Sequence, residues 1–200
     1  MVTGAMISAE ANEARSRHPH LREAVIADAR CTAAFRGERQ DFRSTFDVTL
    51  QILRLAVVSD AFLSQALYRV KASLQRRGVP ILPRLFHRLA IAGAGVYIGD
   101  SVLVHPGIYI VHGQVVIDGA VEIHPRVVIS PAVTVAPSDG DQGPTIGPGA
   151  SLGTGSRVLG EVTVGARARI GANAVVLSDV PEGATAVGVP AQIGDGSAAG

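Results

Sequence analysis

The sequence predicts an all-β fold, a parallel β-helix (hexapeptide repeat), preceded by an N-terminal α-helical domain. An aliphatic residue recurs at every sixth position of one segment, at Ile146, Leu152, Val158, Val164, Ile170 and Val176. Glycine directly follows four of these six aliphatics. Neither an α-helix, with about 3.6 residues per turn, nor an alternating strand, with a period of two, produces a period of six. A fixed repeat of this kind, with glycine at the corner, indicates a solenoid of stacked coils.

The same register extends upstream in a less regular form. It begins at Ile98, lengthens to seven residues between Ile110 and Ile117, and is interrupted by the segment 136–145. Four positions after the keyed aliphatic, the late hexads mostly carry alanine or serine, whereas the early ones carry valine or isoleucine. Because three hexads close one triangular coil, the chain is long enough for about four coils. Irregularity in a repeat is typical of an inserted function.

Upstream of the repeat, apolar residues follow a helical spacing between polar and capping residues. Ser59-Asp60 is a good N-terminal capping pair, and Pro83 falls in the first turn of the last helix. Helices are expected over 21–36, from Ser44 or Thr45 to Val58, from Asp60 to Gly78, and over 81–91. The predicted organisation is a flexible arm (1–20), a helical domain (21–92), a β-helix (93–187) with a loop at 136–145, and a C-terminal tail (188–200).

The composition predicts a cytoplasmic protein without a nucleic-acid or membrane partner. Hydrophobic residues make up 47% of the chain and charged residues 18%. Residues 1–90 carry a net charge of +6 and residues 91–200 one of −5, so the repeat is a poor surface for a phosphate backbone. No apolar stretch approaches the roughly 20 residues of a membrane span. Cys31 is the only cysteine, and the N-terminus lacks the layout of a signal peptide.

The C-terminal half resembles a known family. Residues 144–191 read PTIGPGASLGTGSRVLGEVTVGARARIGANAVVLSDVPEGATAVGVPA, which is similar to the serine acetyltransferase branch of the hexapeptide-repeat acyltransferases. The resemblance extends more loosely to Ile98 and to YRVKASLQRRGVPILPRL. It implies a left-handed β-helix and an O-acetyltransferase that takes its acyl group from acetyl-CoA. It also implies a homotrimer or a dimer of trimers, with acetyl-CoA between neighbouring β-helices.

His112, in IVHGQVV, stands where this family places its catalytic histidine. Transfer of an acyl group to oxygen needs a base that takes the proton of the acceptor hydroxyl, and imidazole titrates near neutral pH. The seven-residue spacing at this point also predicts a local distortion that turns the ring outward. The alternative is a hydrogen-bonded structural histidine at a coil corner.

Three departures from the family pattern lie near His112. The aspartate that precedes the family histidine is Val111 here, and the aspartate that orients it aligns with Tyr97. The family's Arg-His-Pro is replaced by Gln142-Gly143-Pro144. Without these groups the site lacks the charged side chains that would bind the ammonium and carboxylate groups of an amino acid. We therefore expect a small-molecule alcohol other than L-serine as acceptor. The alternative is a catalytically silent scaffold or assembly partner.

The resemblance assigns the donor site to small residues of the late coils. The family holds the pantetheine arm with backbone groups at the positions of Gly153, Thr154, Gly171 and Ala172. Arg169 and Arg167 are the nearest basic side chains for the nucleotide phosphates. The basic residue that the family carries after Gly-Val-Pro-Ala is Gln192 here, which leaves open an acyl-carrier protein as donor. The alternative is that the small residues only turn the corners of the solenoid.

The remaining histidines and the cysteine receive structural roles. His105 and His124 each precede a proline and are assigned to corner packing. Their spacing to His112 is unlike that of a zinc site, so we expect no metal. Asp139 and Asp141 belong to the interrupting loop, where they contact substrate or solvent. Cys31 lies in the helical domain, so direct transfer without an acyl-enzyme is expected.

Overall fold

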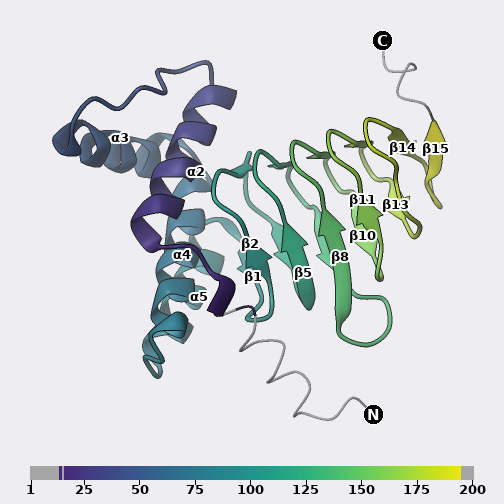
Figure 1. Ribbon diagram of the computed structural model, residues 1–200, viewed down its shortest axis with the longest axis horizontal. Coiled ribbons are helices and arrows are strands. Elements are labelled where there is room, and N and C mark those ends of the chain that lie inside the picture. Colours follow the sequence, from purple (N-terminus) through teal and green to yellow (C-terminus); the bar gives the residue numbers. More distant parts are fainter. Residues whose placement is uncertain (1–13, 15, 195–200) are drawn as a thin grey trace.

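The computed structural model describes residue 14 and residues 16–194, which form a helical region and a parallel β-solenoid (Figure 1). The helical region lies against one end of the solenoid, and the coils run away from it toward the C-terminus. The helical region contains α2 (Leu21–Phe35), α3 (Thr45–Val58), α4 (Phe62–Arg76) and α5 (Leu82–Ala94). Within the described residues, no helix combines the length and apolar character needed to cross a membrane.

Local sequence explains where most of these helices begin and end. The hydroxyl of Ser44 accepts a hydrogen bond from the backbone N–H of Asp47 at 3.1 Å, which caps α3. Pro83 lies in the first turn of α5, and Gly95 ends that helix in the left-handed region at φ +66°. The predicted cap of α4 is wrong, because its N-cap is Ala61 and no side chain caps it. The preceding Asp60 has another partner, described below.

The solenoid consists of three sheets, and each coil adds a strand to each of them. The first sheet contains β1 (Val96–Ile98), β4 (Val115–Ile117), β7 (Thr134–Ala136), β10 (Arg157–Leu159) and β13 (Val175–Val176). The second contains β2 (Leu103–Val104), β5 (Ala120–Ile123), β8 (Gln142–Ile146) and β11 (Thr163–Val164). The third contains β3 (Tyr109–Ile110), β6 (Val128–Ile129), β9 (Ser151–Leu152), β12 (Arg169–Ile170), β14 (Thr185–Val187) and β15 (Gln192–Gly194).

Strand pairing is parallel throughout these sheets, except that β15 runs antiparallel to β14. The five strands of the first sheet mark about five turns, one more than the sequence predicted. The additional turn arises because Val180 bridges to Val164 and so continues the second sheet past β11. The spacing therefore shortens to four residues between Val176 and Val180 and returns to six between Val180 and Ala186.

The keyed aliphatics form the solenoid core, as predicted. Each of them, from Ile98 to Val176, is at most 3% exposed. The residue at the second inward-facing position of each coil becomes smaller along the solenoid. In the third sheet it is occupied, coil after coil, by Ile108, Val127, Ala150, Ala168 and Ala184. The early coils are therefore wider inside than the late ones.

The predicted boundaries shift by a few residues. The helical region extends to Ala94, and the expected loop 136–145 shortens to 137–141 because β8 begins at Gln142. The expected tail 188–200 contains β15, and residues 195–200 lie outside the described part. The same holds for residues 1–13 and 15 of the expected arm, whereas His18 is buried against the ring of Tyr68.

The first coil has no coil before it, so its backbone groups need other partners. Asp28 of α2 accepts hydrogen bonds from two successive N–H groups that begin at Gly107. Arg69 of α4 donates to the carbonyl oxygens of Val104 and His105. Asp28 and Arg69 also pair with each other at 2.8 Å between Oδ2 and Nε, and both side chains are only 2% exposed. One buried ion pair therefore satisfies a whole corner of the first coil.

Two further side chains of α4 serve the same edge. Gln65 Nε2 donates to the carbonyl oxygen of Ile108 at 3.2 Å, and Lys71 Nζ donates to that of Ile98 at 2.7 Å. Lys71 also pairs with Asp100 at 2.7 Å. The helical region is thus fixed to the solenoid by polar side chains that replace a missing strand. This attachment places the turn before α4 next to the corner that holds His112.

Candidate functional site

His112 lies at the corner where the chain passes from the third sheet to the first, between β3 and β4. Its Nδ1 is 2.6 Å from Oδ2 of Asp60, which stands in the turn before α4. Both side chains are more than half exposed. A proton on Nδ1 that is donated to the carboxylate leaves Nε2 as the unprotonated nitrogen. The arrangement presents Nε2 as a base that can act on a bound molecule.

Asp60 gives the imidazole a carboxylate partner, although the position that aligns with the family's orienting aspartate is Tyr97 here. The sequence assigned Asp60 to capping of α4, and its position before a helix is typical of a cap. Its contact with His112 joins residues 52 positions apart across the junction of the two regions. One sequence signal pointed to this contact. Asp60 has the character of a capping residue but stands one position before the N-cap, which is Ala61.

The seven-residue spacing at His112 has a structural cause. Gly113 and Gln114 continue the corner, and the N–H of Gln114 donates to the carbonyl oxygen of Ala94 at the end of α5. Gln114 adopts φ +62°, and a Cβ on Gly113 would overlap the same carbonyl group. The extra residue therefore lets the corner pass the C-terminal end of α5.

A pocket of about 720 Å³ adjoins His112. Its described lining residues are Asp60, Gly93, Ala94, Gly95, His112, Gly113, Gln114 and Pro131. The lining is thus mainly backbone and small side chains, with one carboxylate and no Lys or Arg among these residues. A bound molecule can approach the backbone closely here, but no cationic side chain of the described lining is available for a carboxylate.

The predicted donor residues share a corner with His112. In the third sheet Ile110, Ile129, Leu152 and Ile170 are in register. The residues that follow them, among them His112, Thr154 and Ala172, therefore stack along one edge of the solenoid. Neighbouring strands are about 4.8 Å apart, so Thr154 lies roughly 10 Å and Ala172 roughly 14 Å along the edge from His112. We call this edge the His112 edge.

Two glycines on the His112 edge are required by the fold itself. A Cβ on Gly153 would lie 2.7 Å from the backbone nitrogen of Ala172, and one on Gly171 would lie 2.7 Å from a methyl carbon of Val187. Their N–H groups donate to Ile170 and Ala186 within the sheet. The corner-turning explanation therefore holds for both glycines. The adjoining Thr154 and Ala172 are both exposed, although the carbonyl oxygen of Thr154 accepts a hydrogen bond from the N–H of Asn173 within the solenoid.

The two basic candidates differ in their surroundings. Arg169, on β12, projects outward between Ser151 and Thr185 of the neighbouring strands and is exposed. The guanidinium of Arg167 is paired with Glu182. Within the described residues, no ion pair or hydrogen bond engages the side chain of Arg169. Of the two, Arg169 is the better placed to meet an anion.

The residues that replace the family's carboxylates and arginine take other roles. The ring of Tyr97 packs edge-on against that of His87, with 5.0 Å between the ring centroids. Burial, with a smaller effect of Asp118 and Asp100, raises the pKa of Tyr97. Gly143 is buried in β8, where a Cβ would lie 2.6 Å from a methyl carbon of Val121. Neither position supplies a charged group near His112.

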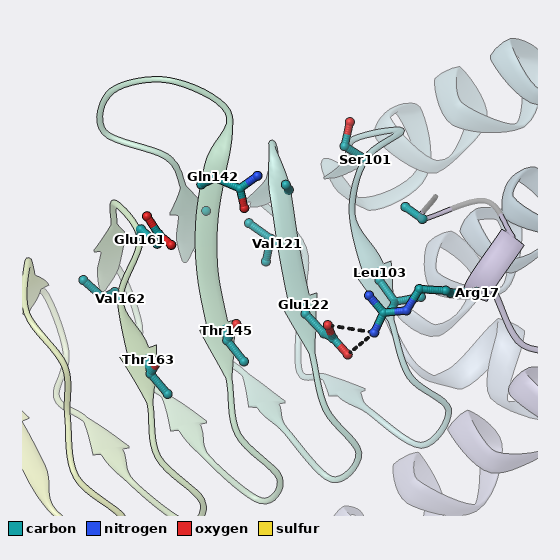
Figure 2. A pocket seen from close by; sticks show the side chains of 13 residues that line it. Arg17, Ser101, Leu103, Val121, Glu122, Gln142, Thr145, Glu161, Val162 and Thr163 are labelled. Atoms are coloured by element: carbon teal, nitrogen blue, oxygen red, sulfur yellow. Dashed lines mark hydrogen bonds and ion pairs between the residues drawn. The ribbon is translucent and has the colours of Figure 1, made fainter. Parts of the chain in front are cut away.

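A second group of polar side chains lies at a different corner, between the second and third sheets. Nε2 of His105 is 2.7 Å from Oε1 of Glu122, and Nε2 of His124 is 3.8 Å from the same oxygen. The two imidazole rings are stacked with 4.8 Å between centroids. Arg17 donates to both oxygens of Glu122 and, as Figure 2 shows, reaches it from outside the solenoid.

This cluster was not predicted from the sequence. The roles of His105 and His124 as corner residues are consistent with their stacking, but Glu122 was not singled out. A signal was present, because His105 and His124 are 19 residues apart and Val104 is in register with Ile123. One coil separates them, so the same corner repeats. Glu122 also lines a groove of about 290 Å³ on the second sheet, together with Thr145 and Thr163 (Figure 2).

Comparison with known proteins places this architecture in a family. Residues 143–178 match the family model described as bacterial transferase hexapeptide (six repeats). The structure is similar to a serine acetyltransferase solved in complex with CoA, with a TM-score of 0.72 and 27% identity over 91% of this chain and 72% of that one. A serine acetyltransferase structure from Brucella abortus, at 22% identity and a TM-score of 0.70, shares the fold.

Sequence relatives divide into long and short matches. The serine acetyltransferase of Haemophilus influenzae is 44% identical over 54 residues, which are 27% of this chain and 20% of that protein. The match to the Bacillus licheniformis enzyme spans a quarter of its length. The serine acetyltransferase of Synechococcus elongatus is 31% identical over 166 residues, which cover 80% of this chain and 68% of that protein. This chain therefore belongs to the serine acetyltransferase family of hexapeptide-repeat proteins.

Proposed function

We propose that the protein is an O-acetyltransferase that moves an acetyl group from acetyl-CoA to a hydroxyl of a small molecule other than L-serine. The observation that carries this proposal is the His112–Asp60 pair at the head of the His112 edge. The pair supplies a base with a defined free nitrogen, and the edge supplies small exposed residues, Thr154 and Ala172, along which a long donor can lie. Membership of the family and its CoA-bound relative support the choice of donor.

The reaction needs one proton transfer in each direction. Nε2 of His112 accepts the proton of the acceptor hydroxyl while its oxygen bonds to the carbonyl carbon of the thioester. The carbon–sulfur bond then breaks, its electron pair goes to the sulfur of CoA, and His112 returns the proton to that sulfur. Asp60 keeps the ring oriented and stabilises the imidazolium that forms between the two steps.

No covalent intermediate on the protein is needed in this scheme. Burial, together with the charge of Asp28, raises the pKa of the Cys31 thiol to about 11. The thiol is therefore protonated at neutral pH and a poor nucleophile. A single cysteine forms no intrachain disulfide and is compatible with a reducing compartment, which supports a cytoplasmic enzyme.

The donor would lie along the His112 edge. Backbone groups at Thr154 and Ala172 would contact the pantetheine arm, and Arg169 would meet a phosphate. Because the N–H groups of Gly153 and Gly171 are used within the sheet, they would not contribute to an oxyanion hole. In this arrangement the late coils hold the arm of the donor, and the reacting thioester lies near His112.

The acceptor would be an alcohol without a carboxylate. Serine carries a carboxylate, and the described lining of the His112 pocket contains no Lys or Arg to bind one. The family aspartates near this histidine are Val111 and Tyr97 here. A sugar or an amino alcohol can use Asp60 and backbone groups instead.

Acetyl-CoA-dependent release of thiol tests the proposal with four proteins: the wild type, His112→Ala, Asp60→Asn and His20→Ala. Acceptors are L-serine and a panel of sugars and amino alcohols without a carboxylate. We expect turnover with a member of the panel and a decrease of about 10²–10⁴-fold in kcat/KM for His112→Ala, as for the loss of a general base. Asp60→Asn should lower kcat/KM less. His20→Ala, which removes an exposed histidine outside the site, is the control.

Each part of the proposal has its own contrary result. Turnover that is unchanged in His112→Ala removes the base, and a preference for L-serine removes the acceptor class. Absence of CoA binding at millimolar concentration, measured by calorimetry, removes the donor and supports the silent scaffold instead. Acyl transfer from an acyl-carrier protein without CoA binding supports the carrier-protein alternative.

We also propose that the active form is a homotrimer, since the family resemblance places the donor between neighbouring solenoids. Light scattering after size-exclusion chromatography measures this directly. The expected mass is about three times the 20.6 kDa of the chain, or six times for a dimer of trimers. A monomeric mass for an active enzyme contradicts this arrangement.

A further inference from the structure

The group formed by His105, Glu122 and His124 has the donor atoms of a metal site. One ligand atom from each residue lies within 4.8 Å of the other two. Ligands of a tetrahedral zinc ion, at about 2.0–2.2 Å from the metal, are separated by roughly 3.3–3.5 Å. The two measured separations from Oε1 of Glu122, 2.7 and 3.8 Å, lie on either side of that value. Small side-chain rotations therefore suffice to place a metal between the three atoms.

We propose that Nε2 of His105, Nε2 of His124 and Oε1 of Glu122 bind one divalent transition-metal ion. Two imidazoles and one carboxylate form a donor set that suits zinc and its neighbours in the first transition row. The site lies within one chain and at a different corner from His112. It is therefore independent of the acetyl-transfer proposal.

The repeat explains why the ligands converge. Val104 and Ile123 are in register on neighbouring coils, so the residues that follow them, His105 and His124, stack at the same corner. At the equivalent position of the next coil stands Gly147, because the N–H of His124 donates to the carbonyl oxygen of Ile146. Gly147 offers no side chain as a further ligand, and the backbone of the next coil fills the space that a Cβ there would occupy. A metal held by three protein ligands could keep a water or an anion as its fourth ligand on the exposed side.

Arg17 fits a role outside the ligand set. It donates to both carboxylate oxygens of Glu122, at 2.9 and 3.0 Å. When Oε1 binds the metal, Oε2 can retain its hydrogen bond to Arg17, which then fixes the orientation of the carboxylate. All three ligand side chains are between 25% and 33% exposed, so an ion can enter while the site is still partly shielded from water.

The ionisation of the group agrees with metal binding. Burial lowers the pKa of His124, and the neighbouring His105 lowers it further, so the imidazole is neutral and free to bind metal near neutral pH. Burial acts to raise the pKa of Glu122, but hydrogen bonds from His105 and Arg17 outweigh it and lower the pKa. The carboxylate is therefore negative at the pH at which His124 is neutral.

Titration of the full chain with Co²⁺ tests the proposal by the visible absorption of the bound ion, and calorimetry with Zn²⁺ gives the stoichiometry. The protein should carry no polyhistidine tag. We expect one ion per chain. His124→Gln and Glu122→Gln should each weaken binding by more than the roughly 10–100-fold that loss of an outer hydrogen-bond partner costs. Arg17→Gln should weaken it within that range.

His112→Gln is the matched control, because His112 is also a histidine paired with a carboxylate at a solenoid corner. Its Co²⁺ spectrum and affinity should equal those of the wild type. Loss of the spectrum in His112→Gln but not in His124→Gln overturns the proposal, as does the absence of any saturable Zn²⁺ binding by the wild type. Circular dichroism of each variant confirms that it is folded. If His124→Gln fails to fold, Glu122→Gln, which keeps the side-chain volume, decides the question.

Discussion

Equivalent corners of the early and late coils carry different residues. The corner between the second and third sheets holds His105 and His124 in the first two coils and Gly147 and Gly165 in the next two. The His112 edge likewise begins with a histidine, and Thr154 and Ala172 stand at the equivalent positions of the late coils. The backbone path is the same in both halves, so the side chains do not follow from the fold. Histidines occupy these corners only in the early half, next to the helical region, whereas the late corners between the second and third sheets carry the Arg167–Glu182 pair.

The late coils form a regular support, whereas the early coils hold the candidate site. In the late coils glycine is dictated by close contact between neighbouring backbones, as the 2.7 Å approach at Gly153 shows. In the first coil, the turn before α4 supplies Asp60 and the end of α5 supplies the backbone at Ala94. The proposed base and its carboxylate partner therefore lie where the helical region meets the solenoid.

The largest effect is expected where the early half depends on the helices. Arg69→Met leaves the carboxylate of Asp28 buried without its partner, and two carbonyl groups of the first coil lose their donor. We expect a loss of about 3–5 kcal/mol in the free energy of unfolding, as for one broken buried ion pair. Denaturation by urea measures it.

Arg167→Met is the control for that experiment, since the ion pair between Arg167 and Glu182 is exposed and belongs to the late half. Its effect should be within about 0–1 kcal/mol, the range of surface pairs. Equal effects of the two substitutions would show that the early half does not depend on the helical region.

A smaller effect is expected from adding a side chain to a late corner. Gly153→Val places a Cβ 2.7 Å from the nitrogen of Ala172, so the coils must separate locally. We expect about 1–3 kcal/mol of destabilisation, as for overpacking. The equivalent residue one coil earlier is Ser130, and Ser130→Val should change stability by about 0.5 kcal/mol or less because a Cβ is already present there. Similar thermal midpoints of both variants would contradict the difference between the halves.

The width of the core can be tested by exchanging two stacked residues. Val127→Ala removes two methyl groups from a wide coil, and Ala150→Val adds them to a narrow one. Each single change should destabilise the protein by about 1–3 kcal/mol. In the double variant the added and removed volumes adjoin, so we expect a coupling of at least about 0.5 kcal/mol in the stabilising direction. Strict additivity would show that the two coils pack independently.

The smallest effect concerns the helical region alone. The hydrogen bond from Arg54 lowers the pKa of Glu38, and Arg36 lowers it further. A lowered carboxyl pKa contributes stability above the ordinary value of about 4.3, and this contribution is lost as the pH falls through the lowered pKa. In Arg54→Gln the pKa of Glu38, followed by NMR, should rise, and acid unfolding should begin at higher pH. An unchanged pKa would show that the ion pair does not persist in solution.

Much of the fold could be predicted because the repeat is local. A coil returns each keyed aliphatic to the same inner wall, so the order of residues alone placed Ile98 to Val176 in the core. The cap at Ser44 is local as well, whereas α5 continues past its predicted end at residue 91 to Ala94 and the cap at Gly95. The fifth turn was missed because Val180 follows Val176 after four residues instead of six and has no glycine after it.

The sites were harder to predict because their partners come from distant parts of the chain. His112 was found from a family pattern, but Asp60 reaches it only after α4 and α5 have docked on the first coil. Glu122 was missed for a different reason. It stands on the outer face of β5, where an acidic residue is ordinarily a solvated one, and only the register of two coils brings it to His105.

The capped edge of the first coil also has a consequence for the length of the particle. A stack of parallel coils has no intrinsic end, since each exposed strand can accept the edge of another chain. The Asp28–Arg69 pair occupies the hydrogen-bonding groups that a further coil would use, and β15 crosses the far end in the opposite direction. The helical region thus blocks this end of the stack, and a solenoid without it would be prone to associate end to end into fibres.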